Sequence, residues 1–130
     1  MDQITVSAVV IRDESGHVLT VRKRGTELLM FPGGKPERGE SAEQAALREV
    51  AEELGVELRV SALRRLGEFT VPAANEPGHQ LHATVFEHPF VEVSAPGAEI
   101  EHLEWIEPDP GGPGLAPLLR DAVFPALGGS

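Results

Sequence analysis

Three glutamates near the middle of the chain are spaced so that they could bind one metal ion. Glu52 and Glu53 follow Glu49 by three and four positions, and side chains with that spacing share one face of an α-helix. Like charges on one face repel each other unless a cation lies among them. Carboxylate oxygens favour a hard divalent cation. We therefore expect a Mg²⁺ site here.

The neighbours of this acidic cluster add groups that suit a metal site. Glu40 lies at the expected entrance of the helix and can supply a fourth carboxylate. Gly33 and Gly34 come shortly before it, and glycine lets a backbone carbonyl approach a metal closely. Arg48 lies beside the acidic face, where its guanidinium could orient a glutamate through two parallel hydrogen bonds.

A helix over residues 42–54 is expected to carry the cluster. Ser41 with Gln44 three positions later fits a capping box, and Gly55 fits the residue just past the helix end. Apolar residues lie on a separate arc of the helical wheel and should face the core. These residues are Ala46, Leu47, Val50 and Leu54.

The other segments predict a sheet on which helices pack. Strands are expected near residues 4–10, 18–21, 58–71, 81–93 and 101–106. The turn residues Asp13 to Gly16 favour a hairpin between the first two strands. A closing helix over 115–124 is expected to be interrupted by Pro125. Several strands with two helices predict an α/β (α+β) fold with a mixed sheet, in a single domain over residues 1–130.

Composition and charge exclude several classes of protein. The net charge of −10 argues against general binding to nucleic acid, and an anionic substrate would need a bound cation or locally placed Lys and Arg side chains. Cysteine is absent, which excludes disulfides and thiolate metal sites. The acidic start at Met1 and Asp2 lacks the layout of a signal peptide, and no long apolar run suggests a membrane span. A cytoplasmic location is expected.

The acidic cluster and its neighbours together resemble a known family. Gly34, five residues, Glu40, seven residues and then Arg48-Glu49-Val50-Ala51-Glu52-Glu53-Leu54-Gly55-Val56 resemble the complete signature of the Nudix hydrolases. Phe31-Pro32-Gly33-Gly34-Lys35 is similar to the segment before that signature in the MutT-like branch. The resemblance implies the α/β/α sandwich of that family, with a mixed β-sheet.

The resemblance also implies an activity and roles for residues. Glu49, Glu52 and Glu53, with the carbonyl of Gly33, would bind Mg²⁺ or Mn²⁺, and one carboxylate would act as general base on water. Which carboxylate it is stays open. The implied enzyme is a Mg²⁺-dependent pyrophosphohydrolase that cleaves a diphosphate bond in a nucleoside triphosphate or a related nucleoside diphosphate derivative. Arg48 is assigned to the catalytic group.

Further positions are assigned to the site on weaker grounds. Lys23 corresponds roughly to a phosphate-contacting basic position of MutT-like members, and strand alternation points it away from Arg22 and Arg24. Glu99, after the turn at residues 95–98, is a candidate for a further metal ligand or base. The expected substrate-binding residues are Lys23, Arg22, Gly34, Lys35 and Glu40.

Other functions stay open at this stage. ADP-ribose or a nucleotide-sugar is the second substrate class, and a non-catalytic nucleotide-sensing module is a rival of a different kind. The absence of tyrosine weakens a dinucleoside-polyphosphate substrate, and no clear counterpart is found for the asparagine with which MutT-like enzymes read oxidised guanine. The expected partner is a small-molecule nucleotide, without nucleic acid or membrane, and the protein is expected to be a monomer or homodimer.

Overall fold

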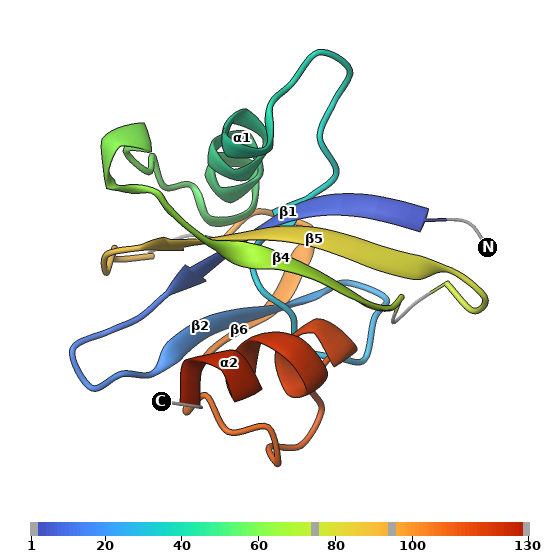
Figure 1. Cartoon of the computed structure of the whole chain (residues 1–130). Coiled ribbons are helices and arrows are strands. Elements are labelled where there is room, and N and C mark those ends of the chain that lie inside the picture. The colour runs from blue at the N-terminus through green and yellow to red at the C-terminus, as the bar shows by residue number, and fades with distance from the viewer. Residues whose placement is uncertain (1–2, 74–75, 94–95, 129–130) are drawn as a thin grey trace.

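The computed structural model of the chain describes residues 3–73, 76–93 and 96–128. Met1 and Asp2, at the acidic start, and Ala95, in the expected turn before Glu99, lie outside the described residues. Two layers of strands form the middle of the molecule (Figure 1). No helix of the described part is long and apolar enough to cross a membrane.

The larger sheet is mixed, as the sequence predicts. Its order is β3 (Gly33–Gly34), β1 (Gln3–Ile11), β5 (Gln80–His88) and β4 (Arg64–Pro72). β1 runs parallel to β5, whereas β1 with β3 and β4 with β5 are antiparallel. The smaller sheet pairs β2 (Val18–Lys23) with β6 (Ile100–Ile106) in antiparallel fashion.

The hairpin expected between the first two strands is wrong. The turn forms, because the Asp13 side chain accepts hydrogen bonds from the backbone N–H groups of Ser15 and His17. The strands then separate after a single bridge between Arg12 and Val18, and β1 joins one sheet while β2 joins the other. The physical reason lies in residues 8–11, which are all buried and therefore need cover on both faces and a place inside a sheet.

Helix α1 (Ala42–Leu54) has the bounds that the sequence predicts. The Ser41 hydroxyl accepts a hydrogen bond from the N–H of Gln44, and the Gln44 side chain accepts one from the N–H of Ser41. Both bonds satisfy donors that the first turn of a helix leaves unpaired. Gly55 ends the helix with φ 67°, a conformation that glycine adopts without steric cost.

The C-terminal helical segment continues past Pro125, contrary to the expected interruption. It consists of η2 (Leu118–Val123), which is a π-helix, and α2 (Phe124–Gly128). The N–H of Phe124 donates to the carbonyl of Leu119 five positions earlier. The wider π turn directly before Pro125 gives the proline ring room, which explains why the helix can continue.

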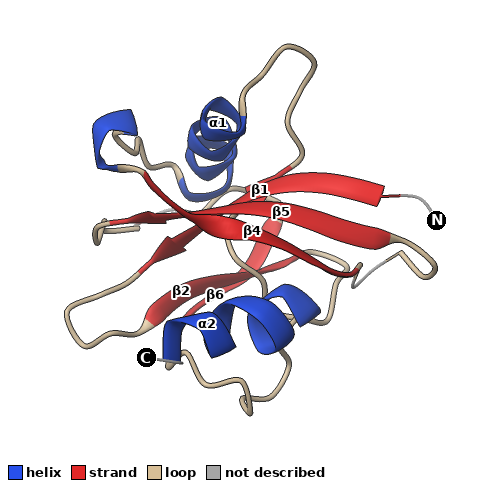
Figure 2. Cartoon of the chain, in the orientation of Figure 1, coloured by secondary structure: helices blue, strands red, loops and turns tan. Residues whose placement is uncertain are grey.

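The two helices lie on opposite sides of the strands, so the expected α/β/α sandwich is confirmed (Figures 1 and 2). Alternate residues of β1 enter two different cores: Ala8 and Val10 pack with Phe124 on the α2 side, whereas Val9 and Ile11 pack with the apolar face of α1. β1 thus lies between the two cores, and the positions of α1 and β3 depend on it.

Candidate active site

Glu53 is a buried carboxylate between α1, β2 and β3. Its side chain is only 4% exposed. One oxygen, Oε1, accepts the N–H of Gly33 at 3.0 Å, and the other, Oε2, lies 3.2 Å from the ammonium of Lys23. Burial raises the pKa of the Glu53 carboxyl, while Lys23 and the Gly33 N–H oppose the rise. The sequence places Glu53 on the acidic face, but the structure turns it inward.

Arg48 donates hydrogen bonds to the other carboxylates of the cluster, those of Glu40, Glu49 and Glu52. Its Nε and Nη2 atoms donate two hydrogen bonds to Glu40, at 2.8 and 3.0 Å. Its Nη1 atom donates to Glu52 at 2.9 Å and to Glu49 at 3.2 Å, and Nη2 also donates to the carbonyl of Lys35 at 3.0 Å. The guanidinium therefore lowers the pKa of Glu40 and holds the loop before α1 against the helix.

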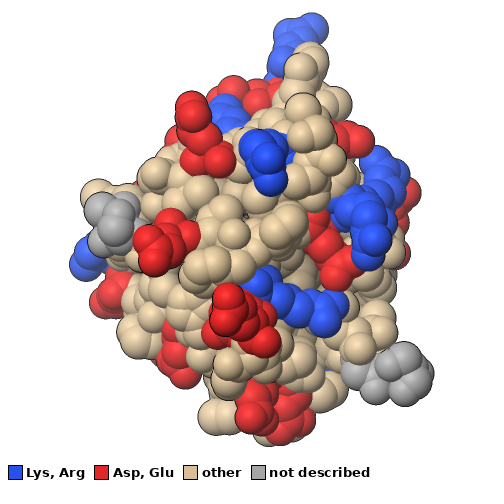
Figure 3. All heavy atoms as spheres, turned by 90° about the vertical axis from the view of Figure 1, so that its left-hand side faces the viewer, with Lys and Arg blue, Asp and Glu red and all other residues tan. Residues whose placement is uncertain are grey.

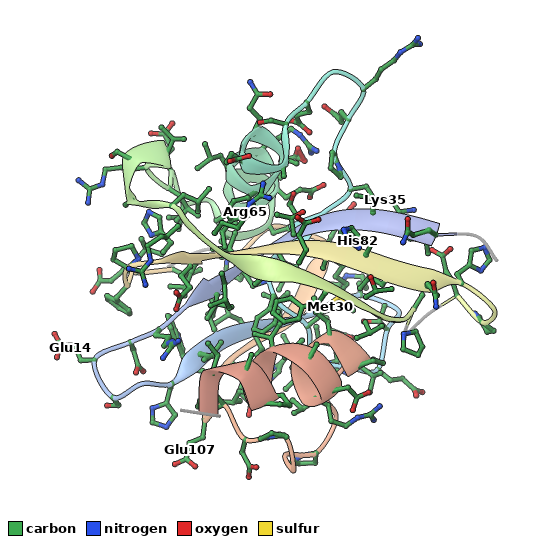
Figure 4. All side chains as sticks on the ribbon, in the orientation of Figure 1. Glu14, Met30, Lys35, Arg65, His82 and Glu107 are labelled. Atoms are coloured by element: carbon green, nitrogen blue, oxygen red, sulfur yellow. The ribbon has the colours of Figure 1, made fainter. Side chains whose placement is uncertain are left out.

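A cavity of about 390 Å³ lies beside these groups. Lys23, Lys35, Glu49 and Glu99 contribute charged groups to its lining, and Glu76 adds a further carboxylate from the loop between β4 and β5. The rest of its lining is mainly apolar and comes from β1, β5 and the segments next to them. It includes Ile4, Val6, Ala8, Met30, Phe31, Pro72, Leu81, Pro117 and Leu118. Figure 4 shows Lys35 above β1 and Met30 between the strands and α2. The cavity thus combines charged groups with extensive apolar walls.

The structure brings only part of the predicted site to this cavity. The predicted residues that line it are Lys23, Gly33, Gly34, Lys35, Glu49 and Glu99. The predicted residues that do not line it are Arg22, Glu40, Arg48, Glu52 and Glu53. Arg22 turns instead toward Glu101 on the neighbouring strand, with Nη1 and Oε2 3.6 Å apart.

Glu99 lines the cavity because two backbone hydrogen bonds hold the loop before β6 in place. The N–H of Gly97 donates to the carbonyl of Glu53 at 2.7 Å, and the N–H of Arg24 donates to the carbonyl of Glu99 at 2.8 Å. The first bond uses a carbonyl at the C-terminal end of α1, which lacks an intrahelical partner. This loop, the end of α1 and the end of β2 are thereby held together.

The sequence does not predict the apolar walls of the cavity or the pairing of Lys23 with Glu53. Met30, Leu81 and Pro117 come from separate segments, and no local pattern marks them as one surface. Lys23 and Glu53 are likewise far apart in the chain. The sequence gives no signal for their pairing, because helical spacing places Glu53 on the acidic face and not toward the core.

The chemistry of the donors suits a divalent cation. Within the part of the chain that the structure describes, Glu40, Glu49, Glu52 and Glu53 form ion pairs with two cationic side chains, those of Arg48 and Lys23. These four carboxylates outnumber their two cationic partners by two, and all the side-chain donors are oxygens. In the described ranges no three His, Cys, Asp or Glu side chains converge as a ready metal cluster.

The charge on the face shown in Figure 3 matches a small ligand better than a nucleic acid. On the face shown in Figure 3, basic side chains are interspersed with acidic ones. An extended basic surface, which a nucleic-acid backbone requires, is not seen on that face. Binding of an anionic ligand would therefore depend on the few cations at the cavity itself.

Comparison with known proteins finds a matching family model and several similar proteins. The chain matches the model of the NUDIX domain over residues 1–121. It is similar to an 8-oxo-dGTP diphosphatase of Haemophilus influenzae, with 41% identity over 73 residues that cover 53% of this chain and 54% of that protein. It is also similar to a CTP pyrophosphohydrolase of Escherichia coli, with 32% identity over 136 residues that cover 98% of this chain and 95% of the relative.

A solved structure agrees with the architecture. The MutT protein from Methanosarcina mazei Go1 superposes with a TM-score of 0.77 at 23% identity, covering 92% of this chain and 89% of that chain. The chain spans about half the length of the 8-oxo-dGTP diphosphatases of Haemophilus influenzae and Escherichia coli that it matches, 54% and 46% respectively.

Proposed function

Because the chain belongs to the Nudix family, we propose that it is a Mg²⁺-dependent pyrophosphohydrolase of nucleoside triphosphates or related nucleoside diphosphate derivatives. The single observation that carries this proposal is the cavity that combines charged side chains, among them Lys23 and Lys35, with extensive apolar walls. A nucleotide has the same two kinds of surface, because it joins charged phosphates to a flat base. The family match over residues 1–121 supports one catalytic domain over residues 1–130.

The chain supplies groups for each part of such a substrate. Lys23 and Lys35 would contact the phosphates, and Gly34 lines the same cavity without a side chain of its own. The apolar wall around Leu81 and Pro117 would hold the base. The names of the two relatives, which act on 8-oxo-dGTP and on CTP, support a nucleoside triphosphate as substrate.

The glutamates would hold the metal and take up the proton of the attacking water. Glu49, Glu52 and Glu53, with the Gly33 carbonyl and Glu99, are the proposed metal ligands. A bound divalent ion would neutralise phosphate charge and lower the pKa of a bound water. Of the three proposed ligands on α1 only Glu49 lines the cavity, so we assign to it the acceptance of the proton. Arg48 would keep Glu49 and Glu52 in position.

A panel of nucleotides tests the proposal. Purified protein is incubated with Mg²⁺ and each common ribo- and deoxyribonucleoside triphosphate, 8-oxo-dGTP, ADP-ribose and a nucleotide-sugar, and the products are separated by anion-exchange chromatography. We expect a nucleoside monophosphate and pyrophosphate from at least one triphosphate. Tight nucleotide binding without turnover of any substrate would overturn the proposal in favour of a sensing module. Cleavage of ADP-ribose alone would reassign the substrate class.

A further inference from the structure

Lys23 connects two different parts of the site. Its ammonium lies 3.2 Å from Oε2 of Glu53, whose side chain is 4% exposed. The same side chain, 32% exposed, also lines the cavity proposed for the substrate. The register of the pairing between β2 and β6 shifts between Arg22 and Lys23, and irregularities of this kind near active sites re-aim side chains. One flexible cation therefore lies between a buried carboxylate and the place for the phosphates.

Glu53 needs a cationic partner in its present surroundings. A buried carboxylate without a partner is strongly unfavourable, and the Gly33 N–H satisfies only Oε1. Lys23 compensates the charge at Oε2. A divalent cation bound at this carboxylate would provide the same compensation. The ammonium and the metal would then compete for a single oxygen.

We propose that Lys23 is an exchangeable counter-ion of Glu53. Before metal binds, its ammonium compensates the buried carboxylate; when the metal arrives, Lys23 releases Oε2 and turns into the cavity, where it meets a substrate phosphate. The metal site and the phosphate site are thereby coupled through one side chain. The inference rests on the proposed function for the identity of the site, but its central claim concerns metal affinity alone.

The geometry suits exchange at Lys23 better than at Arg48. Arg48 is held by a planar fork that contacts Glu40, Glu49 and Glu52 at once, and leaving would break several bonds. Lys23 has a single ion-pair contact to Glu53 on a flexible four-carbon stem. When Lys23 departs, the Gly33 N–H still holds Oε1 in place, so the freed oxygen stays positioned.

Metal binding without nucleotide tests the exchange. Mn²⁺ is titrated into wild-type protein and Lys23→Met at pH 8, and free Mn²⁺ is counted by electron paramagnetic resonance. Removing the competing ammonium should lower the Mn²⁺ Kd roughly tenfold. Lys35→Met is the matched control, because it removes the same charge from the same cavity but leaves the contact to Glu53 intact. Its Kd should change less than about twofold. An unchanged or raised Kd in Lys23→Met overturns the proposal, as does an equal fall in both variants.

Two further measurements keep the proposal testable if Lys23→Met folds poorly. Lys23→Arg keeps the charge, and its guanidinium can donate two hydrogen bonds to a carboxylate. The Mn²⁺ Kd of this variant should therefore rise above the wild-type value. A lower Kd would contradict the exchange. In the Glu53→Gln background, Lys23→Met should leave the Kd within about twofold, since the contested oxygen has lost its charge. A tenfold fall there would mean that Lys23 acts through the general field.

The proposal and the proposed function can fail separately. If the nucleotide panel shows no turnover but Lys23→Met still binds Mn²⁺ more tightly, the counter-ion role holds and the enzyme assignment fails. If triphosphates are hydrolysed and the Mn²⁺ affinity of Lys23→Met is unchanged, the enzyme assignment holds and Lys23 is a phosphate contact only.

Discussion

Gly34 lies so close to Glu49 that a Cβ atom on the glycine would collide with the Glu49 carboxylate. The contact joins β3 to α1, the two elements that carry the start and the middle of the family signature. A side chain on residue 34 would thus displace the carboxylate that lines the cavity. The glycine is required here by space rather than by backbone conformation, because its φ is not in the left-handed region.

Gly34→Ala is expected to reduce activity much more than stability. The added methyl group meets only the far end of a flexible glutamate side chain, which can swing aside at little cost to folding. The displaced carboxylate would no longer be positioned for proton transfer, so kcat should fall roughly a hundredfold. Steady-state kinetics and thermal unfolding of the same preparation measure both effects.

Gly33→Ala is the matched comparison. A Cβ atom at residue 33 would meet the backbone of Ser7 and Ala8, and the residue has φ 150°. Neither the backbone of β1 nor this conformation can adjust easily, so the melting temperature should fall markedly. Equal losses of stability in Gly34→Ala and Gly33→Ala would contradict this difference, in which residue 34 only lacks space for a side chain whereas residue 33 also has a backbone conformation that favours glycine.

Metal removal is expected to abolish hydrolysis. The two uncompensated negative charges among the glutamates motivate this prediction. Excess chelator should stop turnover, and added Mg²⁺ should restore it. Mg²⁺ at about 100 times its Kd should also stabilise the fold by about 2.7 kcal/mol through mass action. Full hydrolysis in the presence of excess chelator would rule out a metal-dependent reaction.

Glu49 and Glu52, two of the glutamates that contact Arg48, should both be needed for turnover although they differ in exposure. Glu49 lines the cavity with a side chain that is 19% exposed, whereas Glu52 is 57% exposed. Glu49→Gln and Glu52→Gln should each lower kcat roughly a hundredfold or more if both are metal ligands. Folding should be retained in both, and for Glu52→Gln the metal-free melting temperature should hardly change.

Glu43→Gln controls for the loss of charge from α1. This residue lies in the first turn of the same helix and does not line the cavity. Its kcat should stay within about twofold of wild type. Wild-type rates in Glu52→Gln on every substrate would remove that residue from the proposed ligand set, whatever Glu49→Gln does.

The sequence predicts local features of the fold well and long-range pairing poorly. The bounds and caps of α1 follow from Ser41, Gln44 and Gly55, because capping depends on atoms a few positions apart. The pairing of β1 with β5 depends on which strands can cover the buried residues 8–11. A turn signal at residues 13–16 contains no information about that, and the hairpin prediction failed for this reason.

In the candidate site, too, the sequence predicts which residues take part but not the surroundings of each one. Residue types and helical spacing select Glu49, Glu52 and Glu53 as candidates from the sequence. Their separate environments are not predictable, because Glu53 is buried against β2 and β3 whereas Glu52 is exposed. The inward turn of Glu53 depends on the packing of α1 against distant strands, which also brings Lys23 within reach.

Arg48→Lys is expected to impair catalysis although it preserves the charge. Arg48 donates two parallel hydrogen bonds to Glu40 and further bonds to Glu49 and Glu52. A lysine ammonium is a single point charge that cannot reproduce this fork. Glu49 and Glu52 would lose their fixed orientation, so kcat should fall roughly tenfold to a hundredfold.

Arg120→Lys provides the matched control for that substitution. Arg120 also makes two bonds to one carboxylate, that of Asp121, but this exposed pair does not line the cavity. Its kcat should remain within about twofold of wild type, because exposed ion pairs contribute little. Steady-state kinetics at saturating Mg²⁺ compare the two variants. A fall in kcat of the same size in both would mean that the loss does not depend on the Arg48 network, and full activity in Arg48→Lys would show that charge alone is sufficient there.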